Sequence, residues 1–185
     1  MPQPARSLLE LDGFSLHRMA TADLPFVFDL YQVGPNRLLV DLPAAQEEAM
    51  VFLQQLEKQP WSMLMVAQQG GKRIGAMATG LTNLVSLNTY LLAMFLEPGA
   101  AAMPLALFTR HLFWTYPLER IYVQFPLLDE TARYGELYQM AGFRHEGVMK
   151  KHQSIAARRF DVAVYGLLRE DFDPWWAGRD SRLAL

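Results

Sequence analysis

The sequence predicts one α/β (α+β) domain in which helices alternate with the strands of a single mixed sheet. Three observations lead to this fold class. The chain has 185 residues, the length of one domain. Its 51% hydrophobic and 19% charged residues can build a large core and argue against disorder. The hydrophobic period switches repeatedly between helical and strand spacing, and no repeat or Ser/Gly-rich linker interrupts it. We therefore expect a single domain over 1–185, with its core at about 13–172 and a C-terminal tail at 173–185.

The first half of the chain is expected to open with a strand and two helices and to continue with a hairpin. Thr21 is a good N-cap for the first helix. The second helix carries its apolar residues on one face, and Gly70-Gly71 is a hairpin turn signal. The predicted elements are strand 13–18, helix 21–30, helix 44–59 and strands 63–68 and 73–79.

The second half is expected to begin with a largely apolar strand that is buried on both faces, so this strand should be central in the sheet. Pro98 and Gly99 end it, and Pro104 suits the first position of the next helix. Gly142 is placed to close a later helix as its C-cap. The predicted elements are strand 88–96, helix 104–114, strand 121–125, helix 131–140 and a closing hairpin of strands 145–153 and 160–168.

Composition excludes several functions. A formal net charge of −2 offers no field for nucleic acid or an anionic membrane. The absence of cysteine excludes disulfides and thiolate chemistry, and fits a reducing compartment. The four histidines lack metal-ligand spacing, and the chain has neither a P-loop nor a Gly-x-Gly-x-x-Gly motif. With no signal peptide and no membrane-length apolar segment, we expect a soluble, cytoplasmic protein without a metal.

Four local motifs follow one another along the chain. They are LHRMATADL at 16–24, KRIG at 72–75, YQMAGF at 138–143 and RHEGV at 144–148 followed by FDVAVYGL at 160–167. In this order they resemble the motifs of the GNAT (GCN5-related N-acetyltransferase) superfamily. The closing hairpin is similar to that of the branch that acetylates the N-termini of ribosomal proteins. The resemblance covers about residues 13–172.

The resemblance implies a mostly antiparallel sheet with a splayed central pair of parallel strands, flanked by about four helices. In that fold the gap between the two strands admits the pantetheine arm of acyl-CoA as an extra strand, and the pyrophosphate lies at the N-terminus of the next helix. The cofactor is acetyl-CoA or another acyl-CoA, acting as a substrate. The residues that this assigns to acyl-CoA are Met94, Phe95, Leu96, Ala101, Ala102, Met103, Leu105 and Ala106.

The pyrophosphate loop departs from the family pattern, Arg/Gln-x-x-Gly-x-Gly/Ala. Its three marked positions fall on Ala101, Pro104 and Ala106, so the basic or amide side chain and the first glycine are lost. Proline donates no N–H and cannot adopt a glycine-only conformation. Losing one or two charge-assisted hydrogen bonds, at roughly 1.5–3 kcal/mol each, would weaken binding by something like 10- to 10⁴-fold. Pro104 is equally an ordinary residue for starting a helix.

The acid and base residues match the family in part. Tyr138 lies at the position of a tyrosine that protonates the leaving thiolate, although a core tyrosine is an equal alternative. The ribosomal branch begins this helix with Asn-x-x-Ser, where this chain has Thr131 and Tyr134, and Tyr134 could also donate a proton. Gln153 replaces the branch's carboxylate base. His152 next to it is expected to face the other way.

Two functions remain after this comparison. The first is an N-acyltransferase that moves an acyl group, acetyl by preference, from acyl-CoA to the primary amine of a peptide N-terminus or a small molecule by direct attack. The second is a GNAT-fold binding or scaffold module with a degenerate CoA loop, or an enzyme whose acyl donor is an acidic carrier protein. The basic cluster Lys150, Lys151, Arg158 and Arg159 is either a solvated strand pair or the docking face for such a partner. The protein would be a monomer or a homodimer.

Overall fold

The computed structural model describes residues 9–39, 43, 45–59 and 61–183. Within them it confirms the predicted fold class: a mixed, mostly antiparallel sheet flanked by helices. The described residues form six α-helices, where about four were expected. The strands are β1 (Leu9–Leu11), β2 (Phe14–Arg18), β3 (Leu64–Gln69), β4 (Lys72–Asn83), β5 (Asn88–Phe95), β6 (Arg120–Pro126), β7 (Arg144–Ile155) and β8 (Arg158–Leu168). The helices are α1 (Leu24–Gln32), α2 (Asn36–Leu39), α3 (Gln46–Glu57), α4 (Ala102–Thr115), α5 (Ala132–Met140) and α6 (Arg169–Leu183).

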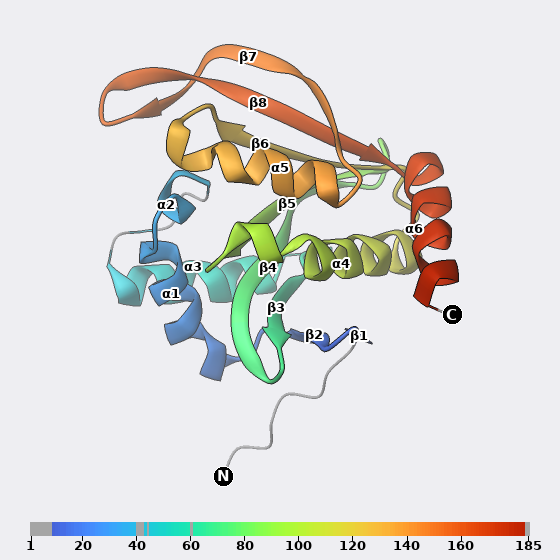
Figure 1. Ribbon diagram of the computed structural model, residues 1–185. Coiled ribbons are helices and arrows are strands. Elements are labelled where there is room, and N and C mark those ends of the chain that lie inside the picture. The colour runs from blue at the N-terminus through green and yellow to red at the C-terminus, as the bar shows by residue number, and fades with distance from the viewer. Residues whose placement is uncertain (1–8, 40–42, 44, 60, 184–185) are drawn as a thin grey trace.

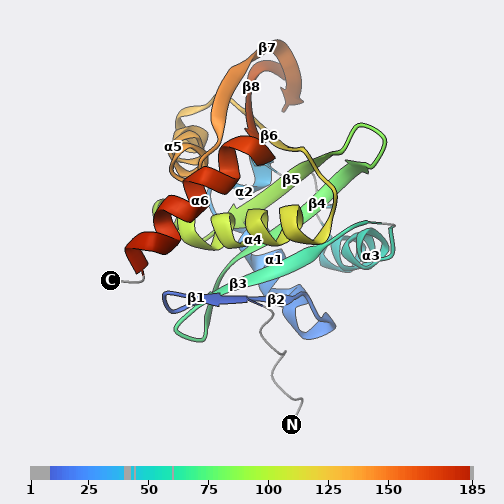
Figure 2. The same ribbon diagram turned by 90° about the vertical axis from the view of Figure 1, so that its right-hand side faces the viewer.

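The eight strands lie in the order β1-β2-β3-β4-β5-β6-β8-β7. All neighbouring strands are antiparallel except β5 and β6, which are parallel and are connected through α4. The sheet therefore has two parts, β1–β5 and β6–β8–β7, which meet at this one parallel pair. Figures 1 and 2 show the two parts at opposite ends of the molecule, with the long β7–β8 hairpin projecting from one of them.

A buried apolar cluster lies on each face of the sheet, as the alternation of strand side chains requires. The larger cluster joins inward-facing residues of the strands to α4, α5 and α6, and includes Phe108, Leu112 and Phe172. The smaller cluster packs α1 and α3 against β3, β4 and β5 through residues such as Val27, Leu53 and Met94. The helices thus hold β5 from both faces, which fixes the strand that ends at the candidate site.

Several local expectations need correction. Thr21 lies in a short 3-10 turn, Thr21–Asp23, and α1 begins only at Leu24. Asp23, not Thr21, stands before that helix, and its buried carboxylate accepts hydrogen bonds from the Ala20 amide (2.9 Å) and from His17 (3.1 Å). Pro104 occupies the third position of α4 instead of the first, because the helix begins at Ala102.

Three elements are additions to the predicted order: β1, α2 and the C-terminal helix α6. Part of the C-terminal tail predicted at 173–185 belongs to this helix, whose tryptophans pack on the rest of the protein. Trp176 is buried in the larger cluster, and Trp175 lies 3.4 Å from where a Cβ of Gly142 would be. Gly142 has a φ of +94°, in the region that glycine adopts without strain, and it follows the end of α5 as expected for its C-cap.

Candidate active site

The parallel strands β5 and β6 pair only at their beginnings. Three residue pairs are in register, from Asn88 opposite Arg120 to Tyr90 opposite Tyr122, and beyond them the two strands diverge. The Tyr90 hydroxyl bridges the start of the gap by donating to the Gln124 carbonyl (3.1 Å). The rest of β5 remains paired with β4 on its other edge. From Leu91 onward, one edge of β5 therefore has no neighbouring strand among the described residues.

The backbone of Phe95 shows how this open edge is satisfied. Leu96 donates its N–H to Ile74 of the β4 segment, so the N–H and C=O of Phe95, one residue earlier, point toward the gap. The Phe95 N–H donates to the Tyr134 hydroxyl (3.2 Å), and its C=O accepts from Asn36 Nδ2 (3.3 Å). Two side chains thus take the hydrogen bonds that a further strand would make.

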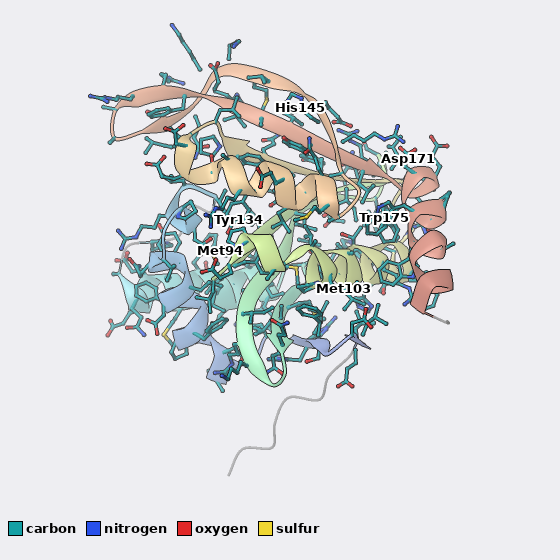
Figure 3. All side chains as sticks on the ribbon, viewed as in Figure 1. Met94, Met103, Tyr134, His145, Asp171 and Trp175 are labelled. Atoms are coloured by element: carbon teal, nitrogen blue, oxygen red, sulfur yellow. The ribbon has the colours of Figure 1, made fainter. Side chains whose placement is uncertain are left out.

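These two side chains are also joined to each other. The Tyr134 hydroxyl donates to Asn36 Oδ1 at 2.6 Å, and Asn36 Nδ2 also donates to the Leu30 carbonyl at 2.7 Å. Asn36 and Tyr134 have no exposed surface. The network therefore links α1, α2 and α5 to the end of β5 and holds the gap closed at Phe95. Figure 3 shows Tyr134 between α5 and the turn that precedes α4.

Three tyrosines converge at the gap. Burial raises the pKa of Tyr90 and of Tyr134 to about 12. Burial likewise raises the pKa of Tyr138 well above its usual value, and the nearby Tyr134 and Tyr90 raise it further. Tyr138 also packs against Phe125 with a ring separation of 5.7 Å. All three phenols are therefore protonated at neutral pH, so they are hydrogen-bond donors and potential proton donors.

The N-terminus of α4 retains two amides for an anion. The first turn of a helix lacks intrahelical acceptors, but Pro104 carries no N–H, and the Leu105 N–H donates to the Ala101 carbonyl (3.1 Å). The amides of Ala102 and Met103 remain, and both residues are half-buried. Their amides and the positive end of the helix dipole could hold a phosphate group, with less than the full set of donors.

The other residues predicted to bind acyl-CoA lie around this turn in different ways. Met94 is buried on the α1/α3 face of the sheet, and Phe95 on the α4 face. Leu96 is 41% exposed. The side chains of Ala101, Leu105 and Ala106 are buried, so these residues contribute only backbone groups and core packing. Among these residues, Phe95, Ala102 and Met103 have the backbone groups best placed for a ligand.

A groove of ≈ 800 Å³ opens where the two parts of the sheet diverge. Its walls come from α2, the second half of α3, strands β4 to β6 and the β7–β8 hairpin. Tyr90 and Gln124 line it, so it reaches the start of the gap between β5 and β6. Leu38 and Leu39 of α2 line it as well, close in sequence to Asn36.

His152 and Gln153 both line this groove, together with Ser154 and Ile155. β7 has a bulge just before Gln153. Met149 is opposite Val162 and Gln153 is opposite Phe160, so three residues of β7 lie opposite Asp161 alone. Asp161 holds the bulge by accepting hydrogen bonds from the Lys150 side chain (2.9 Å) and the Lys151 amide (2.8 Å). Strand alternation is lost there, and strand periodicity alone gave no sign of it.

Solved structures share this fold. A protein of T. thermophilus proposed to be an acetyltransferase is 24% identical, with a TM-score of 0.73, and the match covers 99% of each chain. A variant of the spermidine N-acetyltransferase SpeG from Vibrio cholerae is 18% identical with a TM-score of 0.75, covering 88% of this chain and 97% of that one. RimL, a ribosomal L7/L12 α-N-protein acetyltransferase in complex with coenzyme A, is 14% identical with a TM-score of 0.74, covering 88% and 98%. At these identities the likeness shows the GNAT fold.

No protein-family model matches the sequence, and no curated protein matches it either. In the part of the chain that the structure describes, no three His, Asp or Glu side chains are grouped so that they could hold a metal ion. No helix in that part is long and apolar enough to cross a membrane.

Proposed function

We propose that the protein is an N-acyltransferase that moves an acyl group, acetyl in the simplest case, from acyl-CoA to a primary amine. The observation that carries this proposal is the divergence of β5 from β6 beside the N-terminus of α4, with a large groove reaching the same gap. A donor held at the α4 side and an amine held in the groove would meet at the gap. The amine would then attack the thioester directly.

The donor would be held mainly by backbone groups. The Phe95 N–H and C=O can pair with an amide-containing chain as they would with a strand, once Tyr134 and Asn36 release them. The Ala102 and Met103 amides at the start of α4 would take the pyrophosphate. The missing basic side chain and Pro104 make this a weaker anion site than the family pattern describes. Backbone N–H groups at the gap would polarise the thioester carbonyl.

Two side chains are suited to move protons. Tyr138 is protonated and lies against Phe125 of β6, so it can give its proton to the departing thiolate. His152 lies in the groove, and imidazole is the side chain most often used as a general base. We assign His152 as the group that accepts the proton from the amine. The other titratable groups among the described lining residues are Arg37, which is a cation, and Tyr90, which is a protonated phenol.

A second candidate function is a binding or scaffold module without acyl transfer. One observation favours it: Tyr134 and Asn36 already occupy both hydrogen-bonding groups of Phe95. A buried, fully satisfied polar network stabilises the closed arrangement, so donor entry must displace it. An acyl donor on a carrier protein would meet the same closed gap, because it presents the same pantetheine arm.

The direct test is thiol release from acetyl-CoA in the presence of a panel of primary amines and peptides with free N-termini. We expect turnover with at least one acceptor class. Tyr138→Phe should lower kcat by about 10²-fold or more with little change in KM for acetyl-CoA, since general acid catalysis contributes about 10²–10⁴-fold. His152→Gln should lower kcat with little change in KM for acetyl-CoA. Absence of turnover with every acceptor, in protein that binds those acceptors, would favour the scaffold function.

A further inference from the structure

The groove that reaches the gap has a one-sided charge pattern. Among its described lining residues none is Asp or Glu, whereas Arg37 of α2 is a cation. The remaining lining residues are apolar or neutral polar, including Phe52, Leu56 and Gln59 of the α3 side. A polycationic amine bound there would lose hydration without gaining a carboxylate partner, which is unfavourable.

The β7–β8 hairpin adds positive charge at the rim. Arg158 is opposite Ile155 in the antiparallel ladder. Opposed residues project from the same face, so Arg158 shares the face of Ile155 and Gln153, which both line the groove. Gln153 also donates to the Leu38 carbonyl (3.4 Å), which fixes that face toward α2. Arg158 therefore lies on the groove side of the hairpin.

Among the described residues, none of Arg37, Lys151 and Arg158 forms a side-chain ion pair, although Lys151 lies close enough to Asp161 to lower the pKa of that carboxyl. The ion pairs among the described residues include Lys150 with Asp161 on the same hairpin. Arg37, Lys151 and Arg158 are exposed. Neighbouring unpaired cations along a groove attract an anionic ligand and repel a cationic one.

We propose that the acceptor is the free α-amine of an acidic peptide segment, bound along this groove with its carboxylates near Arg37 and Arg158. The volume of ≈ 800 Å³ suits a ligand of a few residues. The chemistry differs from that of a polyamine acceptor, which needs carboxylates in the pocket. This inference rests on the proposed function for the reaction, but the peptide binding that it specifies can be measured without acyl transfer.

The test is fluorescence anisotropy with two peptides labelled at the C-terminus, AEEDG and AKKKG, both with free N-termini. The acidic peptide should bind at least about 10-fold more tightly at 50 mM NaCl, and the difference should shrink as salt rises, because the rim charges are screened. Spermidine added as a competitor should displace the acidic peptide poorly. Equal binding of both peptides, or efficient displacement by spermidine, would overturn the proposal.

Charge-reversal variants locate the site. Arg37→Glu and Arg158→Glu should each weaken binding of the acidic peptide by about 3- to 10-fold, the range of single exposed ion pairs or slightly above. Lys72→Glu is the matched control, because it makes the same change in net charge at the exposed turn between β3 and β4, away from the groove. Equal losses in all three variants would mean a general charge effect and contradict the assigned groove.

Calorimetric titration of acetyl-CoA into the same variants separates this inference from the proposed function. We expect unchanged donor binding in Arg37→Glu and Arg158→Glu. Acidic-peptide binding in a protein that binds no acetyl-CoA would support the groove assignment and count against acyl transfer. Binding of acetyl-CoA without a preference for the acidic peptide would support acyl transfer and count against the groove assignment.

Discussion

At the scale of single residues, the closure of the gap depends on Tyr134 and Asn36. An unpaired buried N–H or C=O costs about 1–3 kcal/mol, so the end of β5 needs partners whether or not a ligand is present. Tyr134 and Asn36 provide them in the structure described here. A donor with amide groups would have to replace both partners in order to pair with Phe95.

The buried tyrosines lead to a prediction on alkaline titration. The pKa values of Tyr90 and Tyr134 lie at about 12, above the value near 10 of an unfolded chain. A raised pKa favours the neutral form in the folded state, so this contribution to stability is complete below pH 10 and is lost as pH rises from about 10 toward 12. Absorbance at 295 nm should show that three of the seven tyrosines, Tyr90, Tyr134 and Tyr138, ionise last, together with unfolding. Tyr134→Phe should reduce that late step, and a protein whose tyrosines all titrate near pH 10 would contradict the closed gap.

The sequence motifs placed Tyr134 and Tyr138 on the helix that faces the gap, because both residues are close in sequence to the Gly142-Phe143 motif. The motifs gave no sign of Asn36, whose partner Phe95 is 59 residues away along the chain. A turn signal, Gly34-Pro35, precedes Asn36, but nothing in it indicates that the amide reaches the end of a strand. Contacts between distant segments depend on how helices pack, and local periodicity carries no information about them.

At the scale of elements, the pairing of β4 with β5 depends on a glycine. Gly75 is opposite Phe95, and a Cβ on Gly75 would lie 2.2 Å from Cδ1 of the Phe95 ring. The glycine of the 72–75 motif therefore has a structural explanation: it leaves room for the ring that covers the end of β5. Phe95 is buried at 2% exposure, so the ring cannot move aside without disturbing the core.

Gly75→Ala should therefore destabilise the protein by about 1–3 kcal/mol, the usual cost of overpacking a core. Urea unfolding followed by circular dichroism measures this change. Gly80→Ala on the same strand is the control, because a Cβ there meets its nearest neighbour at an ordinary 3.8 Å. Equal midpoints for the two variants would contradict the packing explanation.

The elements themselves were largely predictable, since long periodic segments such as β5 and α4 carry strong patterns. The start of α4 was misplaced by two residues because Pro104 is tolerated throughout the first turn, not at its first position alone. The bulge in β7 was not predicted, because the extra residues of a bulge do not show in the alternation of apolar and polar residues along a strand.

At the scale of the whole molecule, the function we propose depends on the junction between the two parts of the sheet. Three parallel residue pairs join them directly. The start of α6 holds the segment between α4 and β6, where Arg169 donates to the carbonyls of Leu118 (2.8 Å) and Tyr116 (2.9 Å). Farther along the helix, Phe172 packs against Phe113 of α4. These contacts hold one end of the junction while the other end, at Phe95 and Tyr134, is closed by side chains alone.

The sequence could predict that two strands diverge, because the motifs of a known fold specify it. It could not predict what lies in the gap, because that depends on side chains from α2 and α5 meeting there. The weakened anion site at α4, by contrast, was readable from Ala101 and Pro104, and the structure shows the two remaining amides.

The central claim is that the gap between β5 and β6 is the acyl-donor site and that Tyr134 holds it closed. Calorimetric titration of acetyl-CoA into the native protein, Tyr134→Phe and Tyr134→Ser tests it most directly, with circular dichroism confirming that each variant is folded. We predict that Tyr134→Ser binds acetyl-CoA about 10- to 100-fold more tightly than the native protein, since the serine frees the Phe95 N–H and removes the ring. The affinity of Tyr134→Phe should lie between those of the other two proteins. Equal affinities in all three proteins, or no binding by any of them at millimolar acetyl-CoA, would contradict the claim.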